Sequence, residues 1–352
     1  MTRQKCLVLG ASGLVGQRLQ QRLAHHPMFE IAAVAGSSST AGKPLDSVPW
    51  HLEEVRPALP QIIVMDANSA DLATRCHELG VTIAFSGLPS DVAITVEKSL
   101  TESGIMVFSN ASAYRRNSRI PMVIPEINPH HLYKSMHYCA TNCTLIPLAI
   151  PLSVISKLSN IESVVMRSEQ ALSGAGWELL NNEAARLGEV SPHIPGEAEK
   201  THAELLHVLG TLDNYTVLPA DFDVEISCAR ISRKNGHQVF VEVVTEQELS
   251  RQALIDALVS LSAYDSLPSA PYSAIQMVDE IEPENHLWSD GKEFLSNPDP
   301  SIDLKTGMAI VVGNLTIHGK LVCFTAYSHN TIRGAAGGVI FLAELVLKKM
   351  AL

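Results

Sequence analysis

The sequence lacks the features that mark several protein classes. Its six cysteines are scattered, and no Cys or Cys/His group among the 352 residues has the spacing of a zinc site, so we expect reduced thiols and no metal. The net charge of -11 leaves no basic excess for nucleic acid or an anionic membrane. Apolar runs such as 145–155 are short and broken by proline, which argues against a membrane span. The first residues lead directly into a strand-like run without a signal peptide, so we expect a cytoplasmic protein.

Hydrophobic residues make up 46% of the chain, enough for a sizeable core, and its length suggests about two domains. In the first third, strand-like runs alternate with helical patterns, which is typical of a doubly wound, Rossmann-type α/β domain. The strands are expected at 6–10, 31–35, 62–65, 82–86 and 106–109, and the helices at 14–24, 69–79 and 91–103.

After about residue 143 the strands lengthen and fewer helices separate them, which predicts a second, α+β domain with a largely antiparallel sheet. Its strands are expected at 163–167, 224–231, 239–244, 308–312 and 321–327, its helices at 144–158, 178–187, 196–209 and 247–261, and long loops at 264–306. A final helix at 331–348 is expected to return to the first domain. The predicted division is therefore 1–143 with 330–352 for nucleotide binding, and 144–329 for catalysis, substrate binding and oligomerisation.

A glycine-rich turn joins the first predicted strand to the first helix. Gly10, Gly13 and Gly16 form a GxxGxxG variant of the dinucleotide fingerprint, in which small residues let the backbone approach a pyrophosphate at the helix N-terminus. Such a triplet can also be purely structural, but its strand–turn–helix context favours a cofactor site. Candidate cofactor residues from this region are Gly10, Ser12, Gly13, Leu14, Val15, Gly16 and Ser86.

The loop after the second strand indicates which dinucleotide binds. NAD-binding folds usually carry an acidic residue there for the ribose 2′-hydroxyl. This chain has Ser37, Ser38 and further hydroxyl side chains instead, with Lys43 close by. Hydroxyls and a lysine can bind a 2′-phosphate that an acid would repel, so we predict NADP, although an ordinary polar loop would look the same.

Cys143 follows a short strand and stands at the probable start of a helix, where partial positive charge stabilises a thiolate and lowers its pKa. Arg230 and His237 lie at a strand end and the start of the next strand, on either side of a glycine-containing bend. A histidine near a thiol could move protons for it. Taken alone, Cys143 could equally be an inert core cysteine, and His237 could be an exposed loop histidine.

Eight segments in order along the chain resemble the aspartate-semialdehyde dehydrogenase family, in the branch that includes malonyl-CoA reductases. They are the glycine turn, 108–115, 123–128, 142–144, 170–176, 194–200, the pair Arg230 and His237, and 328–337. Two departures are Thr141, where a proline usually precedes the Asn-Cys pair, and Arg116-Asn117-Ser118 after the phosphate arginine.

The resemblance implies a role for each matching position. Cys143 is the expected nucleophile and His237 the acid/base, while Gln170 orients the acyl group and Asn142 helps hold the cysteine region. The remaining expected roles are Arg230 for the substrate α-carboxylate, Glu197 for its ammonium, Lys200 and Arg115 for phosphate, Ser173, Gly174 and Gly176 for a second cofactor loop, and Asn330 near the nicotinamide.

The expected function is NADP-dependent interconversion of L-aspartate-β-semialdehyde plus phosphate with β-aspartyl phosphate, through a cysteine thioester. The principal alternative is an acyl-CoA reductase of the malonyl-CoA type, which needs no phosphate. An N-acetylglutamyl-phosphate reductase is disfavoured because its Gly-Cys-Tyr-Pro motif is absent, and a silent dinucleotide-binding regulator because Cys143 and His237 are both present. Similar enzymes assemble through the second domain, so a homodimer or homotetramer is expected.

Overall fold

The computed structural model describes residues 3–350 and contains two six-stranded sheets. The first sheet is parallel throughout and has the order β3-β2-β1-β4-β5-β6. Its strands are β1 (Gln4–Leu9), β2 (Phe29–Gly36), β3 (Met65–Asp66), β4 (Ile83–Ser86), β5 (Met106–Ser109) and β6 (His137–Cys139). The strand order reverses on either side of β1, and in sheets of this kind a dinucleotide binds in the crevice beyond that switch point.

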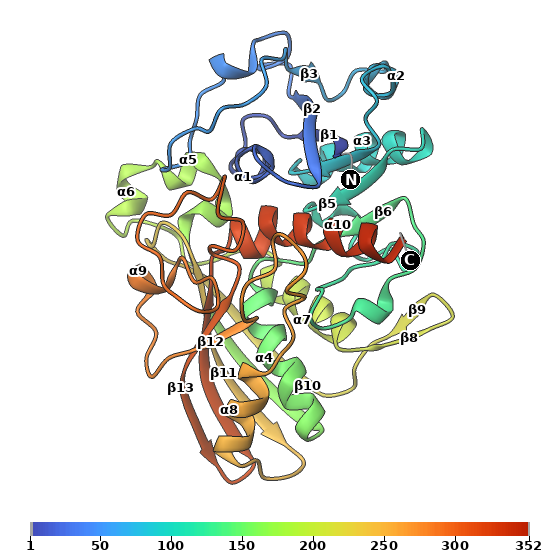
Figure 1. Cartoon of the computed structure of the whole chain (residues 1–352). Coiled ribbons are helices and arrows are strands. Elements are labelled where there is room, and N and C mark those ends of the chain that lie inside the picture. Colours follow the sequence, from blue (N-terminus) through green and yellow to red (C-terminus); the bar gives the residue numbers. More distant parts are fainter. Residues whose placement is uncertain (1–2, 351–352) are drawn as a thin grey trace.

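Helices cover both faces of the first sheet, so its strands are buried and read as continuous apolar runs. One face packs against α1 (Leu14–Leu23) and α10 (Gly337–Met350), and the other against α2 (Leu72–Glu78) and α3 (Ser90–Glu102). Figure 1 shows α10 crossing the middle of the molecule, below the blue and cyan strands of the first sheet. The C-terminal helix therefore completes the core of the N-terminal sheet.

The second sheet is mixed and has the order β10-β7-β11-β14-β13-β12. Its strands are β7 (Ile161–Gln170), β10 (Asp223–Arg230), β11 (His237–Thr245), β12 (Ile275–Met277), β13 (Ile310–His318) and β14 (Leu321–Ser328). The three central pairings are antiparallel, whereas the pairings at both edges are parallel. The predicted fold class is confirmed, with this qualification of the second sheet.

One face of the second sheet is covered by α4 (Leu145–Leu158), α7 (Glu197–Val208) and α8 (Arg251–Val259), which share its hydrophobic core. The opposite face is more open, as the alternation along β7 shows: Val164 and Met166 are buried, while Val165 and Arg167 are exposed. Half-buried alternation of this kind is expected of a sheet covered by helices on one side.

Several elements differ from the sequence predictions. The helix expected at 178–187 is two short helices, α5 (Trp177–Leu180) and α6 (Glu183–Arg186), and a hairpin of β8 (Thr211–Asp213) and β9 (Thr216–Leu218) was not predicted. The expected loop region 264–306 contains β12 and the short helix α9 (Pro283–His286). The final helix is not uniform, because a π-helical turn, Ile332–Ala336, precedes α10. These elements are short, and tertiary contacts outweigh local propensity in them.

The division into domains stays a prediction. The contacts of α10 with α1 and β5 support its assignment of the C-terminal segment to the first domain. Within residues 3–350, no helix is long and apolar enough to cross a membrane. The same part of the chain holds no group of three or more His, Cys, Asp or Glu side chains placed to bind a metal ion.

The glycine turn yields a stability prediction. A Cβ on Gly16 would lie 1.8 Å from the Gly10 carbonyl oxygen, a backbone atom with no room to move. We expect Gly16→Ala to lower the free energy of unfolding by about 3 kcal/mol, as overpacking does, which chemical denaturation would measure. Gly13→Ala is the matched control, because its Cβ would meet only the same oxygen at 3.9 Å. Equal stability of the two variants would contradict the prediction.

Candidate active site

Four polar side chains meet at one end of the second sheet. Arg230 ends β10 and pairs with Gln170, which ends β7, while His237 begins β11 and pairs with Ser328, which ends β14. Because these strands are neighbours in the sheet, the four residues occupy one row across its end. Gln170, His237 and Ser328 are at most 2% exposed, and Arg230 is 8% exposed. The structure thus brings Gln170 together with Arg230 and His237, which lie much later in the sequence.

Cys143 lies between β6 and α4, next to Thr144, which caps the start of α4. This agrees with the predicted position at a helix start. The segment after β14 packs directly against the cysteine: a Cβ on Gly334 would lie 2.6 Å from the Cys143 Cβ. Glycine at 334 therefore lets the π-helical turn approach the proposed nucleophile.

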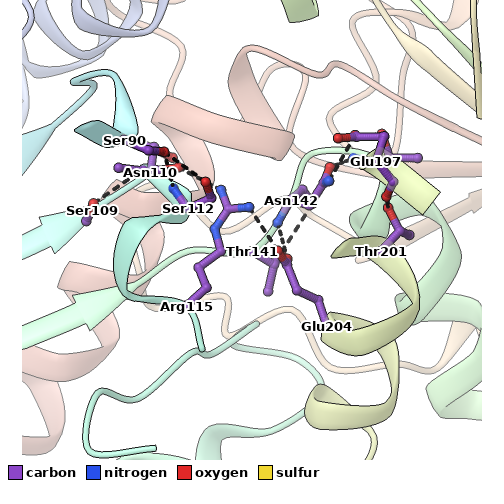
Figure 2. Close-up of polar contacts among 12 residues, drawn as sticks. Ser90, Ser109, Asn110, Ser112, Arg115, Thr141, Asn142, Glu197, Thr201 and Glu204 are labelled. Carbon is purple, nitrogen blue, oxygen red and sulfur yellow. Dashed lines mark hydrogen bonds and ion pairs between the residues drawn. The ribbon is translucent and has the colours of Figure 1, made fainter. Parts of the chain in front are cut away.

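One carboxylate oxygen ties the cysteine segment to the second sheet. Glu197 Oε1 accepts hydrogen bonds from the Asn142 side-chain amide at 2.9 Å, the Gln170 amide at 3.2 Å and the Thr144 hydroxyl at 3.3 Å. Figure 2 shows the Asn142 contact, with Glu197 projecting from α7. Glu197 was predicted to bind a substrate ammonium, and the structure gives it a second use in arranging its neighbours.

His237 has a defined protonation pattern. The Ala171 N–H donates to its Nδ1 at 3.1 Å, and the Ala171 carbonyl accepts from Arg230 Nη1 at 2.6 Å. Burial, and then the charge of Arg230, lower the pKa of His237 to about 3. The imidazole is therefore neutral near pH 7, and because Nδ1 is an acceptor the single proton lies on Nε2.

Gly174 keeps open the space between Arg230 and His237. A Cβ at this position would lie 2.8 Å from Arg230 Nη1 and 3.1 Å from His237 Nε2. The loop predicted to contact the cofactor therefore also borders the catalytic row. His237 Nε2 has no hydrogen-bond partner in the described part of the chain, which leaves its proton available to a ligand.

The Cys143 thiol does not have the low pKa predicted from its place at a helix start. Desolvation of the sulfur, and then the charge of Glu197, raise its pKa to about 12, against the opposing charges of Arg115 and Arg230. A helix N-terminus stabilises a thiolate by at most about 2 kcal/mol. Burial of Cys143 destabilises the thiolate more strongly than that, so the predicted low pKa is wrong. Without bound substrate the group is a thiol.

The glycine turn has the geometry of a dinucleotide site. Gly10 has φ +98°, which favours glycine, and Gly16 cannot carry a side chain. Gly13 is the N-cap of α1, yet no side chain caps this helix and its first turn holds no acid. Such a helix end offers free amides to an anion. The residues present therefore fit the pyrophosphate of a dinucleotide.

The second predicted cofactor loop lies beside the first. Leu14, at the start of α1, packs in one cluster with Leu172 and Leu180 on either side of that loop. Asn330 donates to the Ser173 hydroxyl at 2.9 Å and accepts from the Gly236 N–H at 2.8 Å, so it fastens the loop to the bend before β11. The loop ends at Gly176, whose φ of +99° favours glycine.

The loop after β2 matches the prediction for a 2′-phosphate in its chemistry. Ser37, Ser38, Ser39 and Lys43 are all exposed, and the hydroxyls of Ser37 and Ser39 lie 2.8 Å apart. The other predicted cofactor serine, Ser86, is buried at the end of β4, where its hydroxyl accepts from the Leu88 N–H. Ser12 and Val15 are partly exposed in the glycine turn.

Arg115 and Lys200, the predicted phosphate residues, line one pocket of about 480 Å³ together with Arg116 and Glu204. Glu204 is 6% exposed and forms an ion pair with Arg115. Glu204 was not among the site residues predicted from the sequence. Its position offered a signal, since Glu204 lies seven residues after Glu197 and beside Leu205 on the buried stripe of α7.

Comparison with known proteins agrees with this arrangement. The model of the semialdehyde dehydrogenase NAD-binding domain matches residues 5–135. A solved aspartate semialdehyde dehydrogenase with NADP from Candida albicans superposes with a TM-score of 0.78 at 27% identity, covering 99% of this chain and 100% of that one.

Two sequence relatives have different names. A malonyl CoA reductase (NADP) from Metallosphaera sedula is 29% identical, over 98% of this chain and 97% of its own length. An aspartate-semialdehyde dehydrogenase from Methanothermobacter thermautotrophicus is 36% identical, over 96% of this chain and 97% of its own. With that degree of identity along nearly the whole sequence, the chain belongs to the aspartate-semialdehyde dehydrogenase family.

Proposed function

We propose that the protein is an NADP-dependent aspartate-semialdehyde dehydrogenase, which converts L-aspartate-β-semialdehyde and phosphate into β-aspartyl phosphate and runs in reverse in biosynthesis. The observation that carries the proposal is the row of Arg230, Gln170 and His237 at one end of the second sheet. Glu197 joins Gln170 of that row to the segment of Cys143. The family relationship supports the same reaction.

Each side of the substrate has a matching group. Arg230 offers a planar guanidinium suited to the α-carboxylate. Glu197 uses Oε1 for its neighbours, and its second oxygen makes no hydrogen bond with residues 3–350, which leaves it for the substrate ammonium. Arg115 and Lys200 line the pocket assigned to phosphate. The site thus offers a positive and a negative group for a zwitterionic aldehyde, and two positive groups for an anionic co-substrate.

The cofactor is assigned to the glycine turn, Ser37 to Ser39, the loop from Ser173 to Gly176, and Asn330. When bound, NADP accepts the hydride released from the aldehyde carbon. The protein supplies free helix amides for the pyrophosphate and exposed hydroxyls for the 2′-phosphate.

Covalent catalysis assigns the chemical steps to two residues. Cys143 first loses its thiol proton to solvent and the thiolate attacks the aldehyde carbon. The resulting oxyanion accepts a hydrogen bond from Nε2–H of His237. Loss of hydride restores the carbonyl as a thioester, which phosphate cleaves to release the acyl phosphate and the thiolate. The hydrogen bond from the Ala171 N–H to His237 Nδ1 supports a donor role for Nε2 in the resting form.

A malonyl-CoA-type reductase is the second candidate. The similarity to the Metallosphaera sedula protein favours it, and so does the use of Glu197 Oε1 within the protein rather than for a ligand. A thioester substrate of that kind would need the same thiol and no inorganic phosphate, so dependence on phosphate separates the two reactions.

The open face of the second sheet suggests how the protein assembles. Val165 is 43% exposed on this face, and Arg167 stacks over Phe240 at 3.9 Å from the ring centroid. An apolar and cationic surface without covering helices favours pairing with a second copy, as a homodimer or homotetramer. A cytoplasmic location is supported by the six cysteines, all of which are free.

The reaction is tested by NADP reduction with L-aspartate-β-semialdehyde, with and without inorganic phosphate. We expect turnover that requires phosphate and falls at least about 10⁴-fold in Cys143→Ala, because the variant loses the nucleophile. Cys323→Ala is the matched control and keeps its activity, because Cys323 is a half-buried cysteine whose neighbours Glu242 and Thr316 lie outside the site. Oxidation of NADPH by malonyl-CoA, with no aldehyde turnover, would establish the second candidate instead.

The raised pKa of Cys143 predicts slow alkylation without substrate. The iodoacetamide rate at Cys143, followed by peptide mass spectrometry, should rise about tenfold per pH unit between about pH 7 and 9, because only the thiolate reacts. Glu197→Gln removes a charge that raises this pKa, so its rate near pH 8 should be several-fold higher than in the wild type. A rate already constant from pH 7 upward would show a low thiol pKa and contradict the prediction.

A further inference from the structure

The pocket assigned to phosphate is lined by an anionic group, the carboxylate of Glu204. Figure 2 shows this carboxylate between Arg115 and Asn142. Its Oε1 accepts from Arg115 Nη1 at 3.0 Å, and its Oε2 accepts from the Asn142 backbone N–H at 2.6 Å. The two donors come from separate segments, one after β5 and the other immediately before Cys143. A single carboxylate therefore spans the donors that an oxyanion beside the nucleophile would use.

Among residues 3–350, two of the three nitrogens of Arg115 already have acceptors. Nη2 donates to the Asn110 carbonyl at 2.6 Å, and Nε is buried with no acceptor among residues 3–350. A guanidinium holds phosphate best through two parallel N–H groups. Glu204 uses one of the donors needed for that grip, so phosphate and Glu204 compete for the same arginine.

Charge adds to this competition. The Arg115 and Glu204 side chains are only 10% and 7% exposed, so solvent screens the carboxylate weakly. An arriving phosphate is repelled by Glu204 unless that carboxylate moves away from it. Lys200 lies four residues earlier on α7 and lines the same pocket, and side chains four residues apart on a helix are neighbours. Lys200 is thus placed to receive the displaced carboxylate.

We propose that Glu204 is a positioning residue that stands in for the phosphate group in the resting site and sets the affinity for phosphate. It holds Arg115 and the Asn142 amide in place until phosphate takes over Arg115 Nη1 and that amide. The inference rests on the proposed function, because it assigns the competing anion as the reaction's phosphate.

The test compares Glu204→Gln with the wild type and with Glu199→Gln, which removes the same charge from an exposed position on the same helix. Calorimetry with inorganic phosphate gives Kd without turnover, and steady-state kinetics give KM for each substrate. We expect Kd and KM for phosphate to fall about tenfold in Glu204→Gln. The KM values for the aldehyde and NADP should stay unchanged, as should all the constants of Glu199→Gln.

A purely structural role predicts the opposite pattern. Glu204→Gln would then bind phosphate equally or more weakly and melt at a lower temperature, and this result would overturn the proposal. If Glu204→Gln does not fold, Glu204→Asp replaces it: the shorter side chain cannot span both donors, so the phosphate Kd should fall, and an unchanged Kd overturns the proposal. If Glu204→Gln binds phosphate more tightly but the wild type does not turn over the aldehyde, the proposed function is refuted. The competition between Glu204 and phosphate for Arg115 is then still supported.

Discussion

The arrangement of the site depends on one carboxylate oxygen. Glu197 Oε1 accepts from three groups, two of which flank Cys143 and one of which ends β7. These hydrogen bonds connect the crossover from the first sheet to the functional end of the second. A charged acceptor with three donors is strongly stabilised, but its charge also raises the pKa of the neighbouring thiol. The contacts that hold the proposed nucleophile in place therefore oppose its ionisation in the resting protein.

Charge around the nucleophile is balanced by pairs of residues. Glu197 and Glu204 supply two negative groups from α7, and Arg115 and Arg230 supply two positive groups from other segments. Of these four groups, Arg115 and Glu204 form an ion pair, whereas Arg230 donates to the Ala171 carbonyl. In a protein with a net charge of -11, the two arginines are a local concentration of positive charge beside Cys143.

The sequence predicted what local patterns and motifs determine. The alternation of strands and helices gave the first sheet, and the glycine turn lies where its spacing placed it, with Gly16 in contact with Gly10. Arg230 and His237 could be linked across one bend of the sequence, but placing Gln170 beside Arg230 required the pairing of two strands far apart in sequence, which only the resemblance to a family suggested beforehand. The partners of Glu204 and the high pKa of Cys143 depend on burial and tertiary contacts, which no local pattern reports.

The close approach of Gly334 to Cys143 has a consequence for the order in which the protein is made. The turn that contacts the nucleophile continues into α10, and α10 supplies Val339, Ile340 and Leu342 to the core of the first sheet. A ribosome synthesises the first sheet early, but one of its faces stays uncovered until the residues of α10 leave the exit tunnel. The nascent chain therefore exposes an apolar face of the first sheet until the residues of α10 are available to cover it. The approach of Gly334 to Cys143 and the closure of the first core thus depend on the same late segment of the chain.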